Sequence, residues 1–332
     1  MTDAARPAHA PADHPKIPAP KTGVLLANLG TPDHYSYWPM RRYLSEFLSD
    51  KRVIDYPAWK WQPLLQLIIL SKRPFSSGAA YKSIWNEDRN ESPLMTITKA
   101  QTAAIAETIT DRHGDRVMVD FCMRYGNPST PSKVREMVAA GCTRILFFPL
   151  YPQYAGATTA TANDQFFRAL MDEAWQPAAR TVPAYFDHPA YIEALAQSVE
   201  RAYAAMEKKP DVLVCSYHGM PERYLMQGDP YHCQCQKTTR LLKERLGWGD
   251  SDCPAVTAYN NYDRYQDECT ADSGAYYLMD VQTYRVRDDL NEGVYVHDYA
   301  YLFAEGLALD PLGGSLQMGV YLNYTDTEED GV

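Results

Sequence analysis

Short segments that are apolar at almost every position alternate with segments of helical periodicity from Thr22 onward. A strand without a polar face must be covered on both sides, which is typical of a parallel sheet between two layers of helices. The alternation therefore predicts an α/β fold with two doubly wound domains. The expected strands are residues 23–30, 117–126, 144–154 and 211–216, and the expected helices are residues 38–50, 96–112, 131–141, 160–174, 189–208 and 237–248.

The chain of 332 residues is long enough for two domains of ordinary size. Residues 1–21 are rich in Pro and Ala, and we expect them to form a disordered leader. The N-terminal domain is expected to span residues 22–168 and the C-terminal domain residues 169–332.

The composition of the chain changes near Cys253. Residues 254–332 hold three basic and fifteen acidic residues, no Lys or Trp, and 11 of the 25 tyrosines. We therefore expect an atypical segment from residue 254 onward, and one hypothesis is that it is read from a shifted frame or joined from another source. Resequencing the gene across the Cys253 codon tests this hypothesis, and an unbroken frame shared with close relatives would contradict it.

Several classes of protein have no support in the sequence. It has no G-x-G-x-x-G and no G-x-x-x-x-G-K-[ST] motif, so nucleotide binding is not indicated, and it has no basic patch interleaved with aromatic residues, so no nucleic-acid partner is expected. The longest apolar run, residues 63–71, is too short to span a bilayer. The N-terminus has no export signal, and the seven cysteines are expected to be reduced thiols. We therefore expect a cytoplasmic protein. The sequence does not decide its oligomeric state, for which a monomer is the favoured expectation.

His218 follows an expected strand, in the turn Ser-Tyr-His-Gly-Met-Pro. Ligands of open parallel sheets bind beyond the carboxyl ends of the strands. An imidazole, with an ordinary pKa of about 6.5, can act there as a general base or a metal ligand. The alternative is a loop histidine that bonds only to a neighbouring backbone group.

His232, Cys233 and Cys235 lie close together in the sequence YHCQCQ. The spacing C-x-C, without a second pair, is a poor match to structural zinc sites. We expect these three to be surface residues, whereas Cys215 lies in an expected strand and should point into the core.

Two further strand ends carry candidate binding residues. Arg124 and Tyr125 suit a carboxylate and a flat ring, respectively. In the loop at residues 151–166, Tyr154 and Thr158 are candidate substrate contacts, because hydroxyl and backbone donors before a helix suit an anionic group. The alternative for the threonines of this loop is helix capping.

The segment at residues 38–75 combines three tryptophans, a long apolar stretch and a cluster of Lys and Arg. One interpretation is a pair of core helices. The other is an exposed surface for a large apolar ligand or for a membrane, with basic side chains toward the lipid headgroups.

Taken together, these motifs resemble the ferrochelatase family. The similar stretches are GVLLANLGTPD, ESPL at residues 91–94, MRYGNPS at 123–129, FFPLYPQYAGATT at 147–159 and SYHGMPERYLMQGDPYHCQCQKT at 216–238, and they extend from residue 22 to about residue 253. The resemblance implies two Rossmann-like domains that enclose a porphyrin site, with porphyrin and ferrous iron as substrates.

The resemblance also implies roles for individual residues. His218 would be the iron ligand or proton acceptor, and Arg124 and Tyr125 would lie on the opposite wall. Leu29 and Pro32 would contact the macrocycle. Residues 59–70 would be the lip through which the porphyrin enters, with peripheral contact to the inner face of the membrane.

The sequence departs from the family pattern after Cys253, where the family's acidic motif is absent. Asp298 and Glu305 are the candidates for the acidic residue that would act beside His218. No cofactor is expected, and an iron–sulphur cluster is not indicated, because Ala155 or Gly156 stands where some members have a cysteine. The alternatives are a porphyrin-binding protein without catalytic activity, and a related chelatase that acts on coproporphyrin or on cobalt.

Overall fold

The computed structural model describes residue 13 and residues 18–206, 213–247, 255–260 and 300–303. The expected leader lies mostly outside these residues, and its last residue, Lys21, begins the first strand. The described residues fall into two compact units. One contains the chain up to Tyr151 and residues 156–183, and the other contains residues 152–155 and the described residues from Ala184 onward.

The first unit is built on a four-stranded sheet in the order β2-β1-β3-β4, in which all pairs are parallel. The prediction of an α/β fold with a parallel sheet is therefore confirmed. The strands are β1 (Lys21–Thr31), β2 (Val117–Gly126), β3 (Cys142–Pro149) and β4 (Ala178–Thr181).

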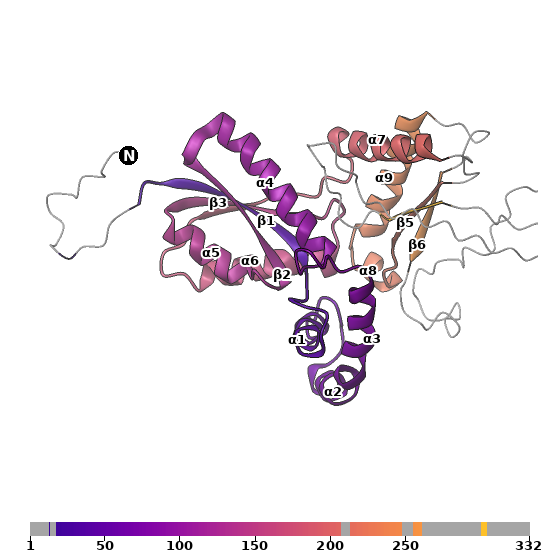
Figure 1. Cartoon of the computed structure of the whole chain (residues 1–332), viewed down its shortest axis with the longest axis horizontal. Coiled ribbons are helices and arrows are strands. Elements are labelled where there is room, and N and C mark those ends of the chain that lie inside the picture. The colour runs from indigo at the N-terminus through magenta and orange to yellow at the C-terminus, as the bar shows by residue number, and fades with distance from the viewer. Residues whose placement is uncertain (1–12, 14–17, 207–212, 248–254, 261–299, 304–332) are drawn as a thin grey trace, which may run out of the picture. The chain divides into compact units, whose positions relative to one another are not determined.

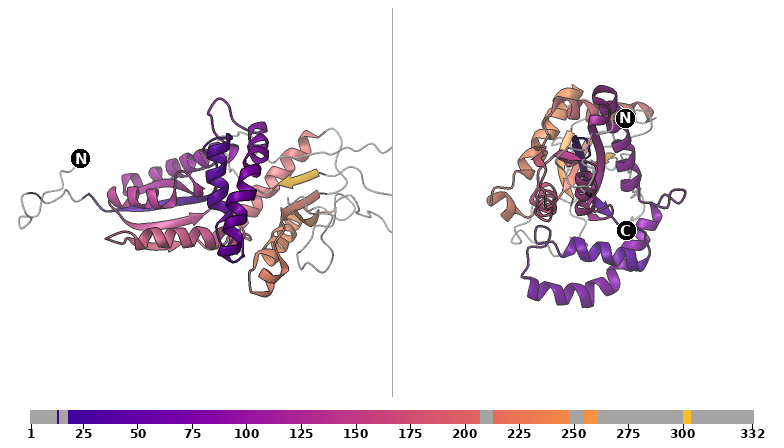
Figure 2. Two further views of the ribbon diagram at one scale, coloured as in Figure 1. Left: turned by 90° about the horizontal axis from the view of Figure 1, so that it is seen from below. Right: turned by 90° about the vertical axis from the view of Figure 1, so that its left-hand side faces the viewer.

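Helices cover both faces of this sheet (Figure 1; Figure 2). Helix α4 (Pro93–His113) lies on one face, and α5 (Thr130–Ala139) and α6 (Thr161–Met171) lie on the other. Ser92 starts α4, because its side chain accepts a hydrogen bond from the backbone N–H of Met95. Short helices η2 (Gly114–Arg116) and η3 (Gly156–Ala160) precede β2 and α6.

Apolar side chains dominate the core between the sheet and the layer of α5 and α6. Phe147 of β3 stacks on Phe166 of α6 with ring centroids 4.3 Å apart, and both side chains are fully buried. Burial of one such ring stabilises the fold by about 2–3 kcal/mol. Apolar strand positions thus hold the two layers together, as the sequence pattern indicates.

Between β1 and α4 the chain makes a helical excursion of α1 (Tyr37–Leu48), α2 (Ala58–Leu64), η1 (Leu65–Ile69) and α3 (Leu70–Ser83). Its inner side buries Met40, Leu65 and Leu70 against Tyr125. Its outer side leaves large apolar side chains exposed. The segment is thus partly core and partly surface, and a contact of this surface with a ligand or a membrane stays a prediction. Among the described helices, none combines the length and the apolar composition that a bilayer-spanning helix needs.

The second unit contains a parallel sheet in the order β6-β5-β7. Its strands are β5 (Leu213–His218), β6 (Ala255–Asn260) and β7 (Ala300–Phe303), and its helices are α7 (Pro189–Ala205), α8 (Glu222–Met226) and α9 (Tyr231–Leu246). Strand β6 lies past Cys253, at the start of the segment that we expected to be atypical, and most of that segment lies outside the described residues.

The domain boundary expected after residue 168 is wrong. Helix α6 continues to Met171, and β4 pairs with β3, so the chain as far as Pro183 belongs to the first unit. The sequence pattern did not predict this strand, because β4 has only four residues and no buried side chain. Conversely, residues 152–155 belong to the second unit.

Gly30 is required where β1 passes β2. Its φ is +117°, and a Cβ there would lie 1.9 Å from the carbonyl oxygen of Tyr125. We expect Gly30→Ala to destabilise the protein by about 3 kcal/mol or more, because it adds an overlap with the backbone to an unfavourable φ. Gly247→Ala is the control, since Gly247 has a φ of +65° in open space and should cost about 1 kcal/mol. Chemical denaturation measures both, and equal costs would contradict the prediction.

Candidate functional site

The polar ends of β1 and β2 lie side by side, as expected for parallel strands. Gly30 pairs with Tyr125 across these strands, so the loop that follows β1 is adjacent to Arg124 and Tyr125. Asn28, which the sequence analysis did not single out, donates from Nδ2 to Oγ1 of Thr98 at 2.9 Å and accepts at Oδ1 from the backbone N–H of Leu29 at 2.8 Å. This amide therefore ties the end of β1 to α4.

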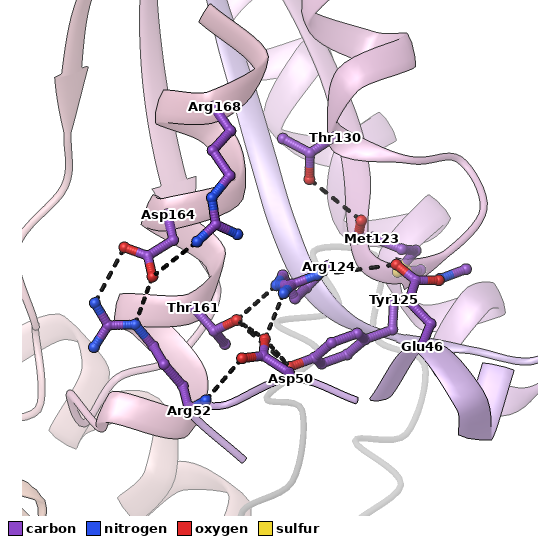
Figure 3. Close-up of polar contacts among 11 residues, drawn as sticks. Glu46, Asp50, Arg52, Met123, Arg124, Tyr125, Thr130, Thr161, Asp164 and Arg168 are labelled. Atoms are coloured by element: carbon purple, nitrogen blue, oxygen red, sulfur yellow. Dashed lines mark hydrogen bonds and ion pairs between the residues drawn. The ribbon is translucent and has the colours of Figure 1, made fainter. Parts of the chain in front are cut away.

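Asp50, two residues after α1, is the centre of the main polar cluster of the first unit (Figure 3). Its Oδ2 accepts hydrogen bonds from the Arg124 guanidinium, from the Thr161 hydroxyl and, at 2.9 Å, from the Tyr125 hydroxyl. Its Oδ1 accepts from the backbone N–H of Arg52 at 2.8 Å. Arg124 Nε also donates to Thr161 Oγ1 at 2.7 Å.

These contacts decide the charge state of Asp50. Burial alone would raise the pKa of its carboxyl group. The hydrogen bonds from Thr161, Arg52 and Tyr125, together with the positive charge of Arg124, outweigh burial and hold the pKa below its usual range. Asp50 is therefore a carboxylate at neutral pH and compensates the buried guanidinium.

Glu46 lies beside this cluster on α1. It accepts a hydrogen bond from the backbone N–H of Gly126 at 2.9 Å and lies 3.9 Å from the Arg124 guanidinium. Burial raises the pKa of the Glu46 carboxyl group, and these two contacts offset that effect only in part. Glu46 is thus the more basic carboxylate of the two.

The structure brings Arg124 and Tyr125 together, but it buries them. Their relative exposure is 7% and 0%, and the Arg124 Cζ lies 4.2 Å from the centroid of the Tyr125 ring. The Arg124 guanidinium and the Tyr125 hydroxyl are bonded to Asp50, and Arg124 also to Thr161. Sequence reasoning missed Asp50 and considered Thr161 only for helix capping, because both residues are distant from Arg124 in the chain. A direct contact of Arg124 or Tyr125 with a ligand stays a prediction.

A cavity of about 320 Å³ opens at the ends of β1 and β2, beside the N-terminus of α4. Thr31 and Pro32 line it, and the hydroxyl of Thr31 is buried without a hydrogen-bond partner. Lys99 also lines the cavity and pairs with the Glu91 carboxylate. Leu29 instead packs, half-buried, against the core formed by α1 and α3.

In the second unit, His218 is the last residue of β5, and its side chain is exposed. Its Nδ1 lies 2.7 Å from the carbonyl oxygen of Gly219. Because a carbonyl only accepts hydrogen bonds, Nδ1 carries the hydrogen in this contact, and the lone pair lies on Nε2. The ring can therefore accept a proton or bind a metal through Nε2. The proposed acidic residues Asp298 and Glu305 lie outside the described residues.

The loop with Tyr154 and Thr158 follows β3. Tyr154 donates its backbone N–H to Gln234 Oε1 of α9 at 2.6 Å. Thr158 is half-buried in η3. Thr161, a capping alternative in the sequence analysis, is the first residue of α6 and bonds to Asp50, whereas Ala160 occupies the capping position.

His232, Cys233 and Cys235 lie on α9 rather than in a loop. Cys233 is exposed, but Cys235 is fully buried in the core of the second unit, so the expectation of a surface position is wrong for Cys235. Burial raises the pKa of the Cys235 thiol far above its usual range and favours the inert protonated form. Cys215 points into the same core, as expected.

Comparisons with known proteins give one consistent result. The family model described as Ferrochelatase matches residues 21–262, so the match extends beyond Cys253 through β6. A protein named Ferrochelatase from Rhodobacter capsulatus is 72% identical over 242 residues, which are 73% of this chain and 69% of the relative. Ferrochelatases from Rhizobium etli and Agrobacterium fabrum are 56% and 54% identical, each over 237 residues, which are 71% of this chain and 68% of each relative.

The Asp50 cluster generates a stability prediction. Asp50→Asn leaves the buried Arg124 charge without its nearest carboxylate, and we expect a loss of about 3 kcal/mol in the free energy of unfolding. Asp164→Asn is the control, because the Arg52–Asp164 pair is largely exposed and should contribute less than about 1 kcal/mol. Denaturant titration of both variants at pH 7 measures the difference.

The lowered pKa of Asp50 adds a pH dependence. The stabilising contribution is complete above the ordinary pKa of an aspartate, about 3.9, and is lost as the pH falls through the lowered pKa. The difference in stability between the wild type and Asp50→Asn should therefore stay constant from neutral pH to about pH 5 and shrink below about pH 4. A difference that grows in acid would contradict this assignment.

Proposed function

We infer that this protein inserts ferrous iron into a porphyrin, since the chain belongs to the ferrochelatase family. The expected reaction converts protoporphyrin IX and Fe²⁺ into protohaem and two protons. The observation in the fold that best supports this chemistry is His218, which stands at the end of β5 with its Nδ1–H held by a carbonyl.

We propose that His218 is the catalytic residue. The porphyrin must lose two pyrrole protons as the metal binds its four nitrogens, so a base is needed beside the ring. The Nε2 lone pair suits this task, since Gly219 holds the ring in the tautomer that leaves Nε2 unprotonated. A rigid site that prefers a bent porphyrin would lower the barrier further by exposing the nitrogen lone pairs.

We also propose that residues of the first unit bind the porphyrin. Leu29 and Pro32 supply apolar contacts after β1, and Arg124, Tyr125 and Thr158 remain candidates for its rim, as does Tyr154 of the second unit. The cavity beside Pro32 offers the positive end of the α4 dipole and the Lys99 ammonium group, which already pairs with Glu91, and these groups suit a carboxylate of the substrate. Iron is then a substrate, and we propose no resident cofactor or iron–sulphur cluster.

The outer surface of α2, η1 and α3 is the proposed porphyrin lip and a peripheral membrane contact. Trp59, Leu67 and Ile68 are 75%, 75% and 58% exposed, and the exposed Lys60 and Lys72 lie on the same segment. A soluble surface rarely exposes this much apolar area, whereas apolar side chains beside lysines suit an anionic bilayer.

The decisive experiment is anaerobic conversion of protoporphyrin with Fe²⁺ by the purified protein. We expect the wild type to form haem and His218→Ala to lose about 10²-fold or more in kcat, the usual contribution of a general base. His113→Ala is the matched control, since His113 is an exposed histidine at the end of α4, and it should keep full activity.

Other outcomes have clear meanings. A wild type that binds protoporphyrin without converting it would overturn the proposed activity in favour of a porphyrin-binding protein. Faster insertion of cobalt, or conversion of coproporphyrin alone, would assign the chain to a related chelatase.

The membrane contact has its own test. We expect the protein to bind vesicles that contain phosphatidylserine, and Trp59→Ser and Leu67→Ser each to weaken binding about tenfold, because each removes a side chain worth about 1.5 kcal/mol or more when buried. Trp175→Ser is the control, since Trp175 is 52% exposed outside this segment. Equal loss in all three variants, or no binding by the wild type, would contradict the proposal.

A further inference from the structure

The loop after β3 is attached to helix α9 by contacts at successive residues. Gln153 donates from Nε2 to Thr238 Oγ1 at 3.0 Å, and the next residue, Tyr154, donates its backbone N–H to Gln234 Oε1 at 2.6 Å. Both acceptors lie on the same side of α9, since they are four residues apart. The loop is thus fixed by one side-chain contact and one main-chain contact.

The same helix also holds the strand that carries His218. The hydroxyl groups of Tyr217 and Thr239 lie 3.1 Å apart and both are buried. His218 follows Tyr217 directly, so α9 restrains the backbone next to the residue that carries the imidazole. Cys235 and Leu242 pack this helix into the core of the second unit, which makes α9 a rigid support.

These contacts are costly to lose. Gln153 is 8% exposed and Thr238 is 1% exposed, so neither polar group can exchange its partner for bulk water without a rearrangement. The Thr238 hydroxyl is further held by the carbonyl oxygens of Phe186 and Gln234, at 2.9 and 3.0 Å. The loop therefore has one well-defined position against α9.

We propose that Gln234 and Thr238 are positioning residues that set Tyr154 relative to His218. This role rests on the proposed function, in which both residues meet one porphyrin. A porphyrin is a rigid, flat ligand, so it cannot adapt to a contact residue that moves. Gln234 thus acts through Tyr154 by holding its backbone amide. Because α9 contacts both the loop and β5, it fixes the position of Tyr154 relative to His218.

The first readout of the test does not depend on activity. Amide hydrogen exchange over residues 152–156 measures whether Gln234 holds the loop. We expect exchange to be about tenfold faster in Gln234→Ala, because the Tyr154 N–H loses its acceptor, and to return to the wild-type rate in Gln234→Glu, whose carboxylate accepts the same bond. Gln236→Ala is the matched control, since Gln236 is an exposed glutamine on the same helix.

The second readout is catalysis per folded molecule. We expect kcat for haem formation to fall about tenfold in Gln234→Ala, with a melting temperature within about 2 °C of the wild type, and to recover in Gln234→Glu. Thr238→Val, which keeps the shape of Thr238 and removes its hydroxyl, should lower kcat in the same direction. A purely structural role would instead lower the melting temperature and leave kcat unchanged.

The two readouts separate the possible failures. Unchanged amide exchange in Gln234→Ala, or an equal change in Gln236→Ala, would overturn the positioning role whatever the activity. Faster exchange with unchanged kcat would overturn its link to catalysis. If the wild type binds porphyrin but forms no haem, the proposed function fails. Porphyrin binding then tests the positioning role, which requires Gln234→Ala to weaken binding about tenfold and Gln236→Ala to leave it unchanged.

Discussion

The buried charge of Arg124 is the constraint on which the first unit depends. A buried guanidinium near the end of the edge strand β2 needs a compensating carboxylate, and Asp50 supplies it from the segment after α1. Because Asp50 also bonds to Thr161 at the start of α6, one carboxylate joins the helical excursion, the sheet edge and the following helix. The position of the helical excursion therefore depends on the position of the strand ends.

A comparable constraint operates in the second unit, but through neutral groups. The loop after β3 leaves the first sheet and bonds to α9 through Gln153 and Tyr154, while α9 also restrains β5 beside His218. Hydrogen bonds between buried amides and hydroxyls fix direction as well as distance. The candidate base and the candidate ring contact thus share one supporting helix, although 63 residues separate them in the chain.

The two supports differ in how they respond to conditions. The Asp50 cluster contains the ion pair of Asp50 and Arg124, so acid weakens the cluster as the carboxylate is protonated. The hydrogen bonds of Gln153 and Tyr154 with α9 join amide and hydroxyl groups, which do not titrate in acid, and these bonds should persist through that change. Acid should therefore disrupt the Asp50 cluster without displacing the loop after β3. This difference separates effects on stability from effects on activity when variants are compared.

The sequence by itself determined the α/β class, the parallel strands and the candidate base, because apolar runs and a histidine at a strand end are local patterns. The sequence motifs between residue 22 and about residue 253 also indicated the family. It did not determine the domain boundary, since β4 is short and has no buried side chain, nor the burial of Arg124 and Cys235. Only the tertiary structure decided that Asp50, Thr161 and Gln234 matter. The hydrogen bonds of Asp50 with Arg124, of Gln234 with Tyr154 and of Thr161 with Asp50 join residues 74, 80 and 111 positions apart, and a sequence pattern reports only near neighbours.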